Sequence, residues 1–138
     1  MVMRWRLHVS LPRAVYQAGK FSIWPILSEK QADFVFSDHF VAGETGNLLL
    51  DQSEKFSELY GRTDLPEGPV VDIADAFVGQ KVCLDVFFVR TQVAKAAPIS
   101  SKYRVYADNL WVADMLAGSN LCWFLKPRLF AYRVGHAS

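Results

Sequence analysis

Basic side chains alternate with apolar ones in two short segments of the chain, and aromatic residues lie close by. Arg4 and Arg6 share one face of an expected strand near the N-terminus, and Lys102 and Arg104 share one face of a second expected strand at residues 102–107. Basic groups contact phosphates, and aromatic rings stack on unpaired bases, each stack contributing roughly 1–3 kcal/mol. The sequence therefore predicts a non-enzymatic domain that binds single-stranded DNA or RNA. The predicted contacts are Arg4, Arg6, Arg90, Lys95, Lys102 and Arg104 for phosphate, with Tyr106 and Trp111 for stacking.

Charge is distributed unevenly, although the formal net charge of the 138 residues is only +1. Residues 1–28 have net charge +4, residues 29–75 have −8, and residues 76–138 have +5. The acidic middle supports an alternative function, in which residues 43–69 dock on a basic protein partner, as an inhibitor of phage or plasmid type or an assembly subunit could. Both patterns also fit simpler interpretations: acidic loops aid solubility, and most aromatics of a small domain fill its core.

Residues that could catalyse a reaction or bind a metal are present but poorly spaced. Asp38 and His39 are adjacent, and Asp72 and Asp75 could share a cation with Asp85, yet no spacing matches a metal site or a hydrolase. The three histidines, His8, His39 and His136, are dispersed and are interpreted as structural or surface residues. We therefore predict no catalytic residues, no metal and no cofactor.

The two cysteines lie in apolar stretches. Cys83 follows Val82, and Cys122 stands within Leu121–Leu125. A free thiol in such a setting usually packs as a small hydrophobic side chain, so we expect two buried, reduced cysteines.

Helices are expected at two places. In residues 51–61, Asp51 could cap the helix with Glu54 completing a capping box, an apolar face would hold Phe56, Leu59 and Tyr60, and Gly61 would end it. In residues 108–118, Asp108 or Asn109 could be the cap and Gly118 the end.

Most of the remaining chain has the periodicity or apolar content of strands. The expected strands cover residues 4–11, 21–27, 32–42, 80–90 as a central strand, 102–107 and 121–134, the last interrupted at Pro127. Residues 69–79 fit a strand or a brief helix, and residues 91–101 fit a long flexible connection within a hairpin.

These elements favour one mainly β domain over residues 1–138, with α+β as the second choice. The expected architecture is a small antiparallel barrel or sandwich, such as an OB-like barrel, with two short helices. The apolar runs are too short to span a bilayer, and the N-terminus lacks the pattern of a secretory signal, so a cytoplasmic location is expected. Oligomeric state is left open by the sequence.

Overall fold

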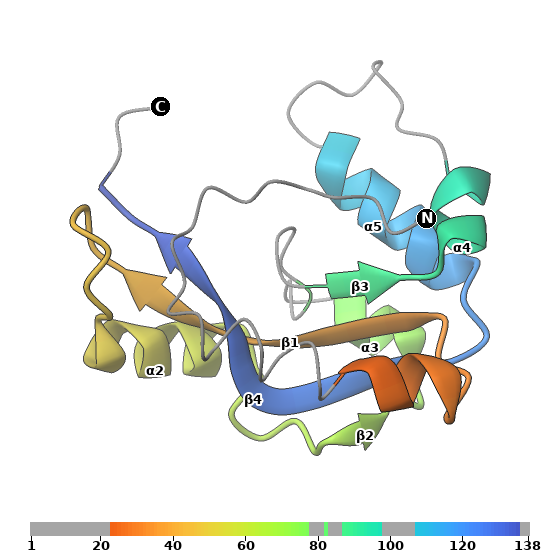
Figure 1. Cartoon of the computed structure of the whole chain (residues 1–138), viewed down its shortest axis with the longest axis horizontal. Coiled ribbons are helices and arrows are strands. Elements are labelled where there is room, and N and C mark those ends of the chain that lie inside the picture. Colours follow the sequence, from red (N-terminus) through yellow and green to blue (C-terminus); the bar gives the residue numbers. More distant parts are fainter. Residues whose placement is uncertain (1–22, 78–81, 83–86, 98–106, 136–138) are drawn as a thin grey trace.

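The computed structural model describes residues 23–77, 82, 87–97 and 107–135 (Figure 1). Its centre is an open four-stranded sheet in the order β2-β4-β1-β3. The two inner strands, β1 and β4, run parallel, and each has a short antiparallel strand on its outer edge. The strands are β1 (Phe34–Ala42), β2 (Gly68–Pro69), β3 (Phe87–Val89) and β4 (Cys122–Arg133).

Helices surround this sheet. They are α2 (Leu50–Leu59), α3 (Ile73–Phe77), α4 (Thr91–Ala96) and α5 (Ala107–Ala117), and residues 23–28 are also helical. The fold is thus mixed α+β, and the expected mainly β barrel or sandwich with two short helices is wrong. The sheet has two free ends, β2 and β3, so it does not close into an OB-like barrel.

Two apolar clusters pack on opposite faces of the sheet, because neighbouring strand residues point to opposite sides. On one face, Phe34, Phe36 and Phe124 pack against α5 through Met115. On the other face, Val35 and Leu125 pack against the 23–28 helix. The runs of β1 and β4 are apolar on both faces because both faces are covered.

The predicted strand at 21–27 is wrong over its described part, since residues 23–28 are helical. Ile23 and Ile26 are both buried in the core, and their spacing of three suits one face of a helix. The Pro25 carbonyl accepts from the Glu29 amide at 2.7 Å, as a helical residue does. A short apolar run does not distinguish the two structures.

The segment around residue 90 also differs from expectation. Residues 87–89 form an edge strand in the described sheet rather than a central one, and the expected flexible connection begins with helix α4. Of residues 69–79, Ile73–Phe77 form a helix, one of the two alternatives. The strand predicted at 4–11 and all but the last residue of the strand predicted at 102–107 lie outside the described residues, and Ala107 begins helix α5 instead.

Several local predictions are confirmed. The strand at 32–42 is β1, the helices at 51–61 and 108–118 are α2 and α5, and the interrupted strand is β4. Gly61 follows α2 with a positive φ of 63°. The predicted cap of α2 is wrong, however, since Leu49 stands at that position and makes no side-chain cap bond. The buried side chains of α2 are Ser53 and Ser57, not the expected aromatic face.

An ion pair ties the start of β1 to the end of β3. The Arg90 Nε lies 3.1 Å from an Asp33 carboxylate oxygen and donates to the Ala32 carbonyl at 3.0 Å. The other Asp33 oxygen accepts from the Asn120 amide at 2.9 Å, just before β4. These bonds give Arg90 a structural role. Among the helices that the structure describes, none has the length and apolar character to cross a membrane.

Cys122, the first residue of β4, is a free, fully buried thiol, as expected, while Cys83 lies outside the described residues. Burial raises the pKa of the Cys122 thiol from 9.0 to about 12. Because only the thiolate reacts, a Cys83→Ser variant is expected to resist iodoacetamide at pH 8 and to become alkylated once urea unfolds it. Mass spectrometry measures both states, and fast alkylation of the folded protein would contradict the placement of Cys122.

Candidate functional site

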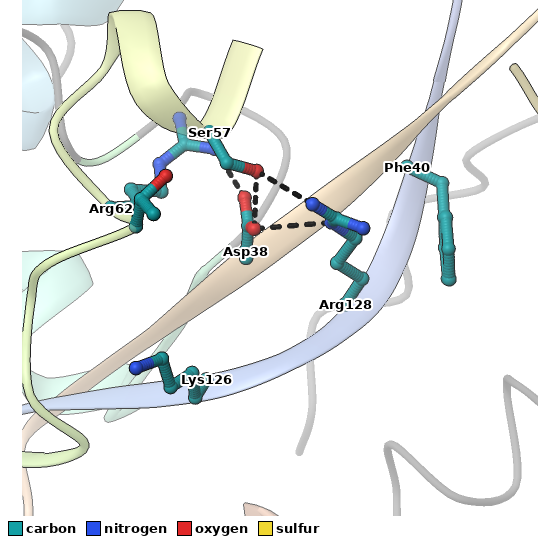
Figure 2. Close-up of a pocket in the computed structure, with 7 residues that line it drawn as sticks. Asp38, Phe40, Ser57, Arg62, Lys126 and Arg128 are labelled. Carbon is teal, nitrogen blue, oxygen red and sulfur yellow. Dashed lines mark hydrogen bonds and ion pairs between the residues drawn. The ribbon is translucent and has the colours of Figure 1, made fainter. Parts of the chain in front are cut away.

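The second half of β1 holds a carboxylate that is almost completely buried. Asp38 is 7% exposed, and each of its two carboxylate oxygens accepts two hydrogen bonds. The Oδ1 atom accepts from the His39 amide at 2.9 Å and from Arg62 Nη1 at 3.1 Å. The Oδ2 atom accepts from Ser57 Oγ at 2.5 Å and from Arg128 Nε at 3.2 Å (Figure 2). Asp38 thus joins three separate parts of the chain.

Helix α2 is held against β1 by two buried serines one turn apart. Ser53 Oγ accepts from the Val41 amide at 2.8 Å, and Ser57 Oγ meets Asp38. Strand β3 pairs only with Phe34–Phe36, so the hydroxyl of Ser53 supplies a partner for a β1 amide beyond that pairing. Buried amides require such a partner, which explains why small hydroxyl side chains face the sheet here.

Arg62 enters the site from the turn after α2. The left-handed backbone of Gly61 ends the helix, and the Arg62 amide then donates to the Ser57 carbonyl at 2.8 Å. This turn directs the Arg62 side chain inward, where the residue is only 1% exposed. Its Nη1 contacts both Asp38 Oδ1 and His39 Nδ1.

Arg128 reaches the site because β4 is irregular. Ser37 pairs with Leu125 but Asp38 pairs with Arg128, so Lys126 and Pro127 are extra residues on β4. Proline has no amide hydrogen to donate to a strand partner and is tolerated at such a bulge. The bulge places Arg128 directly beside Asp38, and its Nη2 also donates to Ser57 Oγ at 3.2 Å.

His39 is 2% exposed and lies edge-on to the rings of Phe56 and Tyr132. Its Nδ1 lies 2.5 Å from Arg62 Nη1, so Nδ1 must be an unprotonated acceptor. Burial, followed by the charge of Arg62, lowers the pKa of His39 from 6.5 to about 4, against the opposing effect of Asp38. The histidine is therefore neutral at pH 7.

A pocket of about 360 Å³ opens beside this cluster. Its lining consists of Asp38, Phe40, Ser57, Arg62, Thr63, Lys126 and Arg128. Three cationic side chains thus accompany a single carboxylate. Figure 2 shows Arg128 bound to Asp38 and Ser57 by one side of its guanidinium, with the remaining nitrogen directed away from Asp38.

Comparisons with known proteins do not identify this site. No protein-family model, curated protein or solved structure matches the chain. The geometry of the pocket is therefore the evidence for its function.

The hydrogen bonds of the cluster favour binding over acid–base chemistry. A carboxylate offers about four lone-pair sites, and the four donors around Asp38 use all of them. Asp38 therefore lacks a free lone pair with which to take a proton from a ligand. His39 Nδ1 faces Arg62 rather than Ser57, so it does not activate that hydroxyl either. Within the described ranges, no three His, Cys, Asp or Glu side chains gather in a way that could hold a metal ion.

The residues predicted from the sequence lie elsewhere or outside the described parts. Arg90 is bound to Asp33, Lys95 is exposed on α4, and Trp111 on α5 lies edge-on to Phe87 with ring centroids 6.2 Å apart. Arg4, Arg6, Lys102, Arg104 and Tyr106 lie outside the described residues. Binding of single-stranded DNA or RNA through this set stays a prediction.

The pocket residues were missed because nothing in their spacing relates them. Asp38 and Arg128 are 90 positions apart, and Arg62 lies in a loop whose other charges are acidic. One local feature pointed here: Pro127 between Lys126 and Arg128 marks a break in a strand with a cation on each side. Such a break indicates a bulge, but not the partner across it.

Proposed function

We propose that this protein binds an oxyanion, a phosphate or carboxylate group, in the pocket beside Asp38. The observation that carries the proposal is the state of Arg128. Of its five N–H donors, Nε is held by Asp38 and one on Nη2 by Ser57, while Nη1 has no hydrogen-bond partner within the described part of the chain. A guanidinium that is fixed in place and still has free donors is well suited to bind phosphate or carboxylate oxygens.

Charge in the pocket supports the same proposal. The carboxylate of Asp38 offsets one of the three cations, Arg62, Lys126 and Arg128, so the pocket retains positive charge. The Arg128 side chain is 23% exposed, which leaves it open to a ligand but partly shielded from water. Partial burial strengthens its attraction to an anion.

Asp38 and Ser57 have a positioning role in this proposal. They fix the Arg128 side chain before the ligand arrives, so less side-chain entropy is lost on binding. Lys126 has a flexible stem and a compact charge, and it can turn its ammonium toward the bound anion.

The proposal is tested by titrating inorganic phosphate, and acetate in parallel, into the ¹⁵N-labelled protein. We expect saturable shifts of the Thr63 and Arg128 amide signals with a Kd of about a millimolar, as befits so small a ligand. The Lys126→Ala variant is expected to weaken phosphate binding about fivefold, because it removes one charge and leaves the backbone bond to Glu67 intact.

Arg128→Ala is expected to abolish saturation. The matched control is Lys55→Ala, which removes an exposed cation from α2 and should leave phosphate binding unchanged. If neither anion gives saturable shifts at these residues, or if Lys55→Ala and Lys126→Ala weaken binding equally, the proposal is wrong.

A further inference from the structure

The cationic pocket has acidic surroundings, which restricts the anions that it can accept. Asp64 follows the pocket residue Thr63 and is exposed. Glu67 is exposed as well, and its carboxylate accepts from the Lys126 amide at 3.0 Å, so it lies against another pocket residue. Both acids stand on the loop that joins Arg62 to β2.

Helix α2 carries further exposed acids close in sequence to a pocket residue. Glu58 is adjacent to the pocket residue Ser57 and is exposed, and Glu54 one turn earlier is exposed too. From residue 43 to residue 69, six acids and one lysine are exposed: Glu44, Asp51, Glu54, Glu58, Asp64 and Glu67, with Lys55. Arg62, the other cation of this range, is buried against Asp38.

A long polyanion in this pocket would bring its neighbouring phosphates close to these acids, and like charges in such proximity oppose binding. A ligand with a single oxyanion places less negative charge near these acids and meets less of this repulsion. A cationic group next to that oxyanion would gain attraction from Asp64 and Glu67.

We propose that the ligand of the pocket is zwitterionic, an oxyanion carried next to an amine, and that Asp64 and Glu67 select it against polyanions. This inference rests on the proposed oxyanion site. The oxyanion contacts Arg128 and Lys126, while the amine lies toward the Arg62–β2 loop. Asp64 and Glu67 are then the residues that determine specificity.

Two ligands of similar size separate the contributions of the two charges. O-phosphoethanolamine and ethyl phosphate both carry a phosphate monoester, but only the first has an ammonium group. At pH 8 both phosphates are fully ionised, since their second pKa is about 6. We expect the protein to bind phosphoethanolamine about fivefold more tightly than ethyl phosphate, as two exposed charges can provide. An oligothymidylate of eight nucleotides is expected to bind more weakly than either phosphate monoester.

The Asp64→Asn/Glu67→Gln variant tests whether these two acids, and not the total negative charge of the protein, determine this order of affinities. It should lose the preference for phosphoethanolamine and gain affinity for the oligonucleotide, while glutamine can still accept from the Lys126 amide. The control is Asp108→Asn/Asp114→Asn, which removes two exposed acids from α5 and should keep the wild-type preference.

The outcomes separate this inference from the proposed site. If both phosphate monoesters bind equally, or the oligonucleotide binds most tightly, the oxyanion site stands and the zwitterion inference is overturned. If phosphoethanolamine binds no better to the protein than to Asp64→Asn/Glu67→Gln, the selecting role of the two acids is overturned. If no phosphate compound binds, the oxyanion site itself fails, and the inference fails with it.

Discussion

Replacing Arg62 by methionine is expected to lower the free energy of unfolding by about 3–5 kcal/mol, a large part of the stability of a domain this size. Arg62 is the largest of the fully buried side chains in the described core. Its removal leaves Nδ1 of His39 without a donor and takes one of the two donors from Oδ1 of Asp38, which keeps only the His39 amide. Asp38 then keeps only Arg128 as a charged partner, and the loss of a buried donor from a carboxylate and an imidazole costs more than the lost contact itself.

Urea unfolding followed by tryptophan fluorescence measures this effect. Lys95→Met serves as the matched control, since Lys95 is an exposed cation on α4, and its unfolding should change by less than about 0.5 kcal/mol. Equal unfolding curves for Arg62→Met and Lys95→Met would show that the buried cluster does not stabilise the fold.

Acidification from pH 6.5 toward pH 4 is expected to destabilise the protein by about 3 kcal/mol through His39 alone. The pKa of His39 is about 4 in the fold, against 6.5 for an ordinary histidine. Between these values the unfolded chain binds a proton that the folded chain does not, so stability falls as the pH is lowered. About one pH unit above 6.5 the imidazole is neutral in both states, and this dependence disappears.

Unfolding midpoints in urea at pH 7.5, 6, 5 and 4.5 measure the dependence, and about 2 kcal/mol of the loss should be present at pH 5. His39→Gln should show a much flatter profile between pH 6.5 and 5. The control removes the two other histidines, as His8→Gln/His136→Gln, and should keep the slope of the wild type. A His39→Gln profile that is as steep as the wild type would refute the assignment.

The local structures that depend on neighbours in sequence could be predicted. Strand β1 was expected from its long apolar run, helix α5 from apolar spacing before Gly118, and the break in β4 from Pro127. Predictions failed where a short apolar segment fits both structures, as at residues 23–28, and where an edge strand resembles a central one, as at 87–89. The incorrect prediction of a barrel followed from counting residues 21–27 as a strand and residues 80–90 as a central one.

The sequence by itself determined that Asp38, Arg62 and Arg128 are charged, that Gly61 can end a helix, and that Pro127 interrupts a strand. Only the tertiary structure decided that these residues meet. The parallel pairing of β1 with β4 and the shift in their register place Arg128 next to Asp38, and the docking of α2 places Ser57 and Arg62 around the same carboxylate. Charge patterning along the chain distinguishes acidic from basic regions. Whether a cation is buried against a carboxylate or free to bind an anion depends on contacts between residues as far as 90 positions apart, which no local pattern records.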